Sequence, residues 1–282
     1  MEENTLDIIE LIQTSYYDLT ATEQRVADYV MAEYDRVQYM SITQLAEECG
    51  TGEATISRFC RSLKLKGFNA FKLELARYCA SRKKPVGEDI PDTPLGQSME
   101  VARRSADAVY QTIGLLDPNS VERAVELIEK AQHVVCIGSG GSLVMAEDCR
   151  QVFSNVTHKF QVVNDSHSQL STASIMGEND LLILFSYSGA TTAGIRVLEK
   201  AKENNVPTVL VTRFNKSPAS ALADVVLCCG SNESPFQSGS VTAKIAQLVV
   251  IDVVFHEYYR RNKEKCDRAI RNIASSLSEL HL

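Results

Sequence analysis

Five short apolar runs, separated by segments long enough for helices, place the strongest constraint on how the carboxy-terminal part of this chain folds. The runs cover residues 134–138, 160–163, 181–186, 207–212 and 225–229. Strands that are apolar along their whole length are buried on both faces, and strands that alternate with helices pair in parallel. The pattern predicts an α/β domain with a doubly wound, five-stranded parallel sheet.

Hydroxyl side chains are concentrated where the third run ends. Ser186, Ser188, Thr191 and Thr192 surround Gly189, at the point where the backbone turns toward the next helix. A helix N-terminus offers unpaired N–H groups and the positive end of a dipole, and both favour an anion. The turn therefore predicts a site for a phosphate monoester. The alternative is that one of the serines only caps the helix.

A second loop, IGSGGS, follows the first apolar run and is expected at the same edge of the sheet. A strand followed by G-x-G and a helix also suggests a dinucleotide site, with Asp165 in the place of a ribose-binding acid. The third glycine of that fingerprint is missing, because position 143 is Leu. We therefore expect no nucleotide cofactor, and we interpret Ser139, Gly140 and Ser142 as the other side of the phosphate pocket.

The first 82 residues are predicted to be all helical. Thr20 with Glu23, and Ser41 with Gln44, form two capping boxes, each followed by apolar residues at helical spacing. The helix that begins after Ser41 is expected to end at Gly50, where a positive φ angle is needed. The next helix then begins near residue 53.

The helices expected at residues 42–49 and 53–63 have the layout of a helix-turn-helix. Ile56 and Phe59 would pack behind the second helix, whose outward side chains could reach base edges in a major groove. A small bundle used for packing or dimerisation would show similar periodicity. The candidate DNA contacts are Ser41, Ala54, Thr55, Ser57, Arg58, Arg61 and Lys66.

The distribution of charge favours the DNA-binding interpretation. The whole chain of 282 residues has a net charge of −7, but residues 58–84 contain nine basic residues and one acidic residue, Glu74. A run of charge is often only a solvated helix face. A one-sided basic segment that begins in the second helix of a helix-turn-helix is more typical of a surface for nucleic acid.

Residues 19–80 also resemble the amino-terminal domain of RpiR-type bacterial transcription regulators. The resemblance is most specific in the A-T-I-x-R-F stretch at residues 54–59 and in K-G-F at residues 66–68. The chain departs from the family pattern where Thr51 and Gly52 replace the usual Val-Ser, and where Lys64 stands in place of Gly. The resemblance implies a helix-turn-helix that binds double-stranded operator DNA.

Residues 120–260 resemble the SIS (sugar isomerase) domain, which binds phosphorylated sugars. The resemblance is carried by S-x-S-G-x-T at residues 186–191 and by the S-P-A-S-A-L-A-D run at residues 217–224. It implies that Ser186, Ser188, Gly189 and Thr191 hold the phosphate, with Ser139, Gly140 and Ser142 near the sugar. Glu233 matches the region where isomerase relatives place a catalytic glutamate, and it is our remaining candidate for ligand contact.

The choice between a regulator and an enzyme depends on titratable groups. Aldose–ketose isomerisation needs a base and usually an acid. Glu233 is the only plausible base, with His167 and Lys244 as more distant candidates. We therefore predict a regulator, not an enzyme, whose sugar-phosphate effector changes its affinity for DNA. The alternative is a sugar-phosphate isomerase with an appended helical domain.

The expected organisation is a helix-turn-helix domain at 1–82, a linker and connecting helix at 83–118, and an SIS domain at 119–282. The proline-containing segment 83–96 has no apolar periodicity and is expected to be extended. Because one helix-turn-helix covers few base pairs, we expect a homodimer or homotetramer built through the SIS domains.

Composition excludes several other classes of protein. No apolar stretch approaches the length of a membrane span, and the acidic start MEENTLD is not a signal peptide, so we expect a cytoplasmic protein. The eight cysteines form no C-x-x-C pair and are expected to be buried thiols. The five histidines lack the spacing of a metal site, and we expect no metal.

Overall fold

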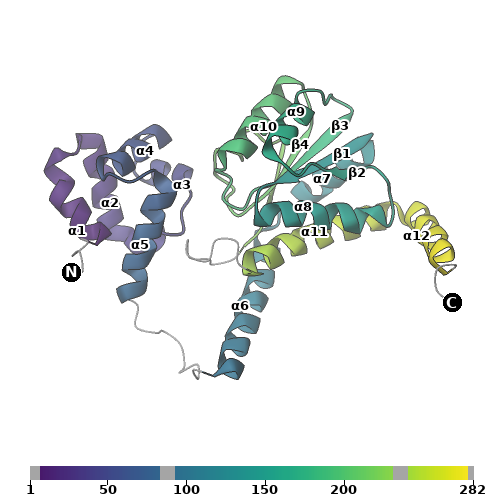
Figure 1. Ribbon diagram of the computed structural model, residues 1–282, viewed down its shortest axis with the longest axis horizontal. Helices are drawn as coiled ribbons and strands as arrows, with labels where there is room; N and C mark the ends of the chain where they lie inside the picture. The colour runs from purple at the N-terminus through teal and green to yellow at the C-terminus, as the bar shows by residue number, and fades with distance from the viewer. Residues whose placement is uncertain (1–6, 83–92, 231–240, 279–282) are drawn as a thin grey trace. The chain divides into compact units, whose positions relative to one another are not determined.

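The computed structural model describes residues 7–82, 93–230 and 241–278 (Figure 1). The chain divides into two compact units, and the division falls between Arg103 and Arg104, inside helix α6. Each unit has a hydrophobic core of its own. Among the described residues, no helix is long and apolar enough to cross a membrane.

The amino-terminal unit is all helical, as predicted. Its elements are α1 (Ile8–Ser15), the 3-10 helix η1 (Tyr16–Asp18), α2 (Ala21–Val37), α3 (Ile42–Glu48), α4 (Glu53–Ser62) and α5 (Phe68–Arg82). Both predicted capping boxes form: Thr20 and Glu23 begin α2, and Ser41 and Gln44 begin α3. Ile56 and Phe59 are fully buried, so α4 packs on the face that the sequence predicted.

Glu23 also joins two helices of this unit. Its carboxylate accepts hydrogen bonds from the backbone N–H of Thr20 at 2.9 Å and from the hydroxyl of Ser62, on α4, at 3.0 Å. Burial opposes ionisation of Glu23, but the hydrogen bonds from Thr20 and Ser62, together with the positive charge of Arg58, lower its pKa. The capping carboxylate therefore holds α4 against α2.

The second unit contains the predicted parallel sheet. Its strands are β1 (His133–Gly138), β2 (Phe160–Val162), β3 (Asp180–Phe185), β4 (Thr208–Thr212) and β5 (Val225–Cys228). Helix α6 (Pro94–Leu115) crosses the division between the two units. The other helices of the second unit are α7 (Pro118–Lys130), α8 (Gly141–Ser154), α9 (Ser166–Ala173), α10 (Thr192–Glu203), α11 (Val241–Arg261) and α12 (Lys263–Ser278). The strand order is β2-β1-β3-β4-β5 and every pairing is parallel, which confirms the predicted fold class.

Helices cover both faces of the sheet (Figure 1). Side chains that alternate along each strand divide between two clusters: Val134 and Cys136 of β1 pack with α7, α8 and α11, whereas Val135 and Ile137 pack with α9 and α10. This double cover explains why all five strands are apolar along most of their length.

Helix α6 begins earlier than the sequence suggested. Thr93 precedes the helix and its hydroxyl accepts from the N–H of Gly96 at 3.1 Å, while Pro94 takes the first helical position. Proline suits that position because its missing N–H would have no partner there. The expected extended segment 83–96 is therefore three residues too long at its end, and residues 83–92 lie outside the described part of the chain.

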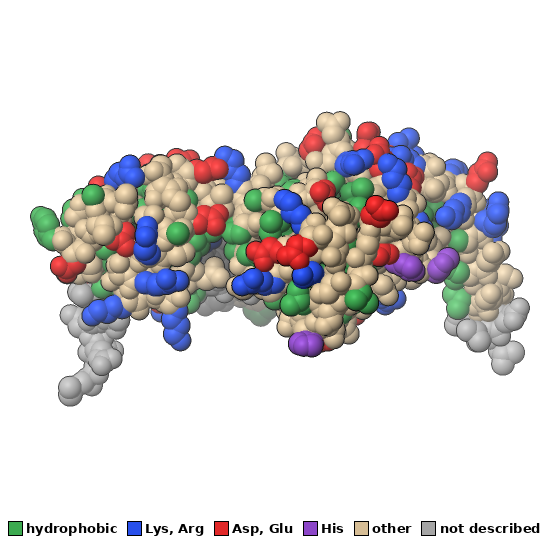
Figure 2. All heavy atoms as spheres, turned by 90° about the horizontal axis from the view of Figure 1, so that it is seen from above, with side chains coloured by type: hydrophobic (Ala, Val, Ile, Leu, Met, Phe, Trp, Pro, Cys, Tyr) green, Lys and Arg blue, Asp and Glu red, His purple; other side chains and the backbone are tan. Residues whose placement is uncertain are grey.

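Charge is mixed on the surface, as Figure 2 shows: acidic and basic side chains lie side by side over both units on the face that it presents. This agrees with the modest net charge of −7. No broad basic field covers that face.

Candidate functional site

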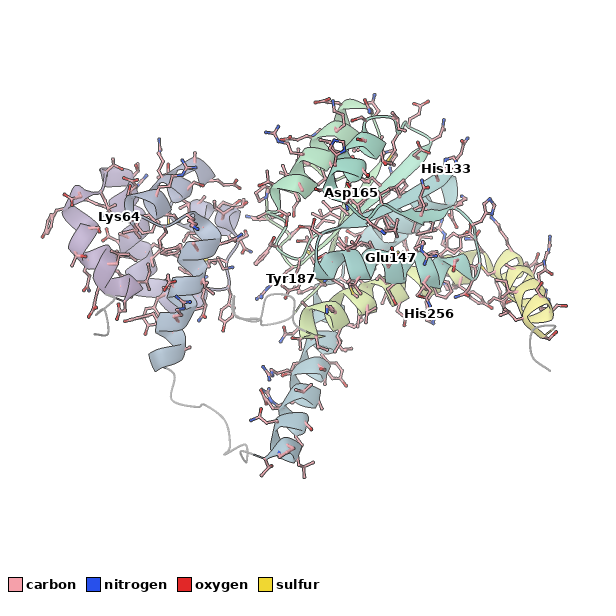
Figure 3. All side chains as sticks on the ribbon, in the orientation of Figure 1. Lys64, His133, Glu147, Asp165, Tyr187 and His256 are labelled. Carbon is pink, nitrogen blue, oxygen red and sulfur yellow. The ribbon has the colours of Figure 1, made fainter. Side chains whose placement is uncertain are left out.

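Two loops rich in glycine and hydroxyl residues leave the sheet at the same edge; we call residues 138–142 and 186–191 the hydroxyl loops. Gly138, the last residue of β1, is paired in register with Phe185, the last residue of β3. Because the two strands are neighbours and parallel, the loops that follow them begin side by side. Figure 3 shows His133, at the start of β1, and Tyr187, just after β3, at opposite ends of the parallel strands.

The first hydroxyl loop requires glycine for two different reasons. A Cβ on Gly138 would lie 2.7 Å from the carbonyl carbon of Ser142, so the close approach of β1 and α8 excludes any side chain there. Gly140 is the N-cap residue of α8 and has φ +56°, a conformation that L-residues rarely adopt. Ser139 and Gly140 are exposed and Ser142 is half-buried. Helix α8 thus begins without a side-chain cap.

The second hydroxyl loop is held against the segment that follows β4. Gly189 has φ +61°, and a Cβ there would lie 2.2 Å from the Oγ of Ser217. Its carbonyl accepts from the N–H of Ala219 at 2.9 Å. Ser186 is buried, and the Oγ of Ser188 accepts from the N–H of Ala190 at 3.3 Å. The loop is therefore a fixed structure in which glycine is obligatory.

The start of α10 presents unpaired backbone donors. Thr191 is its exposed N-cap residue, but its side chain forms no capping hydrogen bond within the described structure. Within that same part of the chain, the N–H groups of Thr192, Ala193 and Gly194 have no hydrogen-bond partner. Such a helix start, with a free hydroxyl beside it, can bind an anion. The alternative that one of the serines caps this helix finds no support in the described structure, because the N-cap residue is Thr191 and α10 has no side-chain capping bond.

The neighbouring helix α9 begins in the opposite way. Its N-cap residue, Asp165, accepts from the backbone N–H of Ser168 at 2.9 Å. Hydrogen bonds from the side chain and backbone of Ser168 lower the pKa of Asp165. This carboxylate is occupied as a helix cap, which weakens the alternative in which it binds a ribose.

Sequence reasoning missed one residue that orders the first hydroxyl loop. The Nε2 group of Gln169, on α9, donates to the carbonyl of Gly138 at 2.8 Å and to the carbonyl of Val163 at 2.9 Å. Gln169 is only 2% exposed, so its amide satisfies two carbonyls at the sheet edge. A glutamine in a polar helix gave no signal for this role, because its partners are 31 and 6 residues away in the sequence.

Three further candidates came from the sequence. Glu233 lies outside the described residues. His167 is exposed on α9, and Lys244 is half-buried near the start of α11. In the described ranges, no group of three or more His, Cys, Asp or Glu side chains could hold a metal ion.

The exposed face of α4 carries most of the predicted DNA contacts. Ala54, Arg58 and Arg61 are exposed and Ser57 is half-buried, whereas Thr55 is only 7% exposed. The expectation that Thr55 faces outward is therefore wrong. It lies four residues before Phe59 and so shares the buried side of the helix, where its hydroxyl accepts from Nη2 of Arg58 at 3.1 Å.

The other two candidates flank this helix. Ser41 is buried, and its hydroxyl accepts from the N–H of Gln44 at 3.1 Å, so its main role in the structure is to cap α3. Lys66 is exposed just beyond the end of α4. At the start of α4, Gly52 replaces the usual serine and provides no side-chain cap.

Helix α4 ends with a lysine in an unusual conformation. Lys64 has φ +59°, its N–H donates to the carbonyl of Arg61 at 2.8 Å, and the N–H of Leu65 donates to the carbonyl of Cys60 at 3.0 Å. These two bonds form a Schellman motif, in which glycine is the usual residue at the left-handed position. The helix therefore ends as it would with glycine, and Lys64 adds an exposed positive charge (Figure 3).

The other basic residues of the segment 58–84 are partly engaged. Lys72 donates from Nζ to the carbonyl of Met40 at 2.9 Å, and Arg77 pairs with Glu74 at 2.6 Å. Among the described side chains of this segment, Arg58, Arg61, Lys64 and Lys66 are exposed and lie on α4 or just beyond its end. This is the local basic group that the net charge of the chain conceals.

Comparison with protein families gives two matches. Residues 6–82 match the model of the helix-turn-helix domain of the rpiR family, and residues 127–257 match the model of the SIS domain. The chain is 32% identical over 256 residues to an HTH-type transcriptional regulator of Haemophilus influenzae, and the alignment covers 88% of each chain. It is 30% identical over 274 residues to an HTH-type transcriptional regulator of Caldanaerobacter subterraneus, and that alignment covers 96% of this chain and 97% of the relative. Both relatives are named as transcriptional regulators, not as enzymes.

Among solved structures, the NanR protein of Vibrio vulnificus in complex with ManNAc-6P resembles the whole chain. The TM-score is 0.87 at 26% sequence identity, and the alignment covers 98% of this chain and 100% of NanR. The similarity therefore covers both units.

Proposed function

Because the chain belongs to the RpiR family of helix-turn-helix transcriptional regulators, with an SIS domain at its carboxy-terminal end, we propose that it is a one-component sensor of a phosphorylated sugar. The sugar phosphate binds at the hydroxyl loops and changes the affinity of the helix-turn-helix for operator DNA. Such a protein acts in the bacterial cytoplasm, where both DNA and phosphosugars are found.

The unpaired start of α10 is the observation that carries this proposal. Three backbone N–H groups, the hydroxyl of Thr191 and the positive end of the helix dipole converge beside the carboxyl end of β3. Doubly wound sheets bind their ligands at that edge. The phosphate would sit there, and Ser139, Gly140 and Ser142 would face the sugar. Since NanR binds ManNAc-6P, an N-acetylhexosamine 6-phosphate is the first candidate effector.

In the helical unit, α4 is the proposed recognition helix. Its exposed side chains are short at the start, at Ala54, and basic farther along, at Arg58 and Arg61. Short side chains permit close approach to the major groove, while arginine binds guanine or phosphate. Lys64 and Lys66 extend the positive surface toward the DNA backbone.

The proposed organisation follows the family matches: a DNA-binding domain at 1–82, a linker and connecting helix at 83–118, and an SIS domain at 119–282. Two copies paired through their SIS domains, as a homodimer or as half of a homotetramer, would place two heads on an inverted repeat. The effector shifts this assembly only by its difference in affinity for the DNA-bound and free arrangements.

Ligand binding is tested by thermal unfolding of the full chain with a panel of hexose, hexosamine and N-acetylhexosamine 6-phosphates. Each sugar without its phosphate serves as the control. We expect one phosphosugar, with ManNAc-6P tried first, to raise the melting temperature, and its dephosphorylated form to have no effect. No shift with any member of the panel would contradict the sensor.

DNA binding is tested by selection from a random duplex library, followed by footprinting with and without the ligand found above. We expect Arg58→Ala to weaken binding to the selected DNA at least tenfold while the thermal shift with phosphosugar is unchanged. A matched control is Arg196→Ala, which removes an exposed arginine from α10 of the sheet unit. Loss of both DNA binding and phosphosugar binding in the Arg58→Ala variant would contradict the assignment of these two activities to separate domains.

A further inference from the structure

Helix α11 contains a buried polar atom without a hydrogen-bond partner. Gln247 is only 2% exposed, and its Oε1 atom neither reaches solvent nor accepts a hydrogen bond within the described residues. A buried acceptor that lacks a partner costs free energy, and such atoms are rare in native proteins. A leucine at this position would occupy a similar volume without that cost, so the glutamine calls for an explanation.

The amide of Gln247 can be oriented in only one way. Its Nε2 group donates to the carbonyl of Ala243 at 3.1 Å. Rotation of the amide by 180° would set two acceptors against each other, so the nitrogen must stay on that carbonyl. The partner that Oε1 lacks is therefore a donor, an O–H or an N–H group. A phosphate dianion has only acceptors, whereas a sugar carries several donors.

Helix α11 runs antiparallel to the strands, so it begins at the edge of the sheet that carries the hydroxyl loops (Figure 1). It follows β5 in the chain, and β5 ends beside β4, where Cys228 is paired with Thr212. At its other end, Arg261 forms an ion pair at 3.0 Å with Glu129, which lies at the end of α7 just before β1 begins. The start of α11 and the carboxyl ends of the strands therefore share one edge.

Gln247 lies level with the second hydroxyl loop. Val250 and Ile251, about one turn farther along α11, line a small internal cavity together with Phe185, the last residue of β3, and Cys149 of α8. Gln247 is one helical turn closer to the edge, a step of about 5 Å at 1.5 Å per residue. The same step along β3 leads from Phe185 into the second hydroxyl loop.

The first hydroxyl loop lies on the other side of the same region. Helix α8 begins in that loop and packs against α11. The side chain of a helical residue points back toward the helix start, and the hydrogen bond to Ala243 holds Gln247 in that direction. The unpaired oxygen of Gln247 is therefore turned toward the edge where the two hydroxyl loops meet.

We propose that Oε1 of Gln247 accepts a hydrogen bond from an O–H or N–H group of the sugar and so determines which sugar the site accepts. The inference rests on the proposed function, because a phosphate held at the start of α10 would bring its sugar to this acceptor. A buried acceptor discriminates strongly, since a ligand without the matching donor leaves it unpaired. The hydroxyls of Ser139 and Ser142 can donate or accept, so they discriminate less.

Calorimetric titration of Gln247→Leu and wild type tests the contact. The probes are ManNAc-6P, glucosamine 6-phosphate and glucose 6-phosphate, with inorganic phosphate as the probe of the anion site alone. For the phosphosugar that binds wild type most tightly, we expect the affinity to fall about tenfold, as for the loss of one hydrogen bond. The affinity for inorganic phosphate should not change. Gln247→Met, which is unbranched like glutamine, should show the same loss and replaces Gln247→Leu if that variant folds poorly.

The stability of the ligand-free protein distinguishes recognition from packing. We expect the melting temperature of Gln247→Leu to equal or exceed that of wild type, because an apolar group replaces an unpaired acceptor. The matched control is Gln151→Leu, which removes an exposed glutamine from α8 and should leave every affinity unchanged. A lower melting temperature with unchanged affinity would make Gln247 a packing residue and overturn the proposal.

Failure of this inference and failure of the proposed function give different results. If wild type binds a phosphosugar and both Gln247 variants bind it equally well, only the role of Gln247 is wrong. If the affinities for phosphosugar and inorganic phosphate fall together, Gln247 supports the anion site and does not read the sugar, which also overturns the inference. If wild type binds none of the phosphosugars, the sensor itself is contradicted and the role of Gln247 falls with it.

Discussion

The helical unit and the sheet unit use serine and threonine for opposite purposes. In the helical unit, Thr20 and Ser41 accept hydrogen bonds from the first turns of α2 and α3, and each is part of a complete capping box. In the sheet unit, Thr191 stands at the same position of α10 but makes no capping bond within the described chain. A capped helix end is stable by itself, whereas an open end retains donors for a ligand.

The comparison shows that residue type does not distinguish a structural hydroxyl from a functional one. The surrounding residues decide, because a capping box needs a glutamate or glutamine three residues after the hydroxyl. Glu23 and Gln44 stand there in the helical unit, but Gly194 stands there after Thr191. Helix α4, which follows Gly52, also begins without a side-chain cap. Both α10 and α4 therefore begin without a side-chain cap, and each belongs to a proposed binding surface.

We expect the largest loss of stability when the turn at Gly189, in the second hydroxyl loop, is disturbed. We expect Gly189→Ala to destabilise the sheet unit by about 3 kcal/mol, because the residue keeps φ near +61° and its Cβ would meet Ser217. Urea unfolding measures the loss. The control is Gly177→Ala, where a Cβ would find nothing within 4 Å. Equal stability of the two variants would show that the turn is not obligatory.

Removal of the carboxylate that joins two helices should have the next largest effect. Glu23→Ala should cost about 2 kcal/mol at pH 7, since the Ser62 hydroxyl and the Thr20 N–H lose a charged acceptor. The pKa of Glu23 is lowered in the folded protein, so its contribution is present above the unfolded carboxyl pKa of about 4.3 and is lost as the pH falls through the folded value.

Denaturation at pH 7 and at about pH 3 measures this dependence. We expect the difference between wild type and Glu23→Ala to shrink as the solution is acidified. Glu178→Ala removes an exposed carboxylate from a loop and serves as the control. A difference that stays constant with pH would mean that Glu23 stabilises the helices by packing, not by its charge.

Deletion of one hydroxyl in each unit tests directly whether Ser41 is a structural cap and Thr191 a ligand contact. Ser41→Ala should cost about 1 kcal/mol of stability through the lost cap and leave phosphosugar binding unchanged. Thr191→Ala should change stability by less than about 0.3 kcal/mol and weaken phosphosugar binding about tenfold, as expected for one hydrogen bond to a charged group. Unfolding and calorimetric titration are run on both variants. The reverse pattern would make Thr191 a structural cap.

The smallest effect is expected at the end of α4. Lys64→Gly should raise stability by about 0.5–1 kcal/mol, because glycine adopts the left-handed conformation without strain. The control is Asn205→Gly at the equivalent position after α10, with φ +55°, where asparagine already tolerates that conformation and the gain should be smaller. If Lys64 contacts DNA, its replacement also lowers DNA affinity, which anisotropy with the selected duplex would detect.

Local patterns in the sequence were sufficient for several of the elements. The capping boxes at Thr20 and Ser41, the five apolar runs and the glycine at position 50 all predicted features that the structure contains. Each of these signals depends on residues within about one helical turn or one strand. The exposed direction of Thr55 was predicted wrongly, because a small polar side chain can lie on the buried side of a helix.

The sequence by itself determined the order of helices and strands, the two hydroxyl loops and the basic segment, since these depend on neighbours along the chain. Only the tertiary structure decided which groups at the sheet edge are occupied: it left Thr191 without a capping bond in the described chain and placed Gln169 on the carbonyl of Gly138. The register of β1 with β3 brings together loops that lie almost 50 residues apart. No local pattern encodes such contacts, because they arise only when the sheet and its helices are packed.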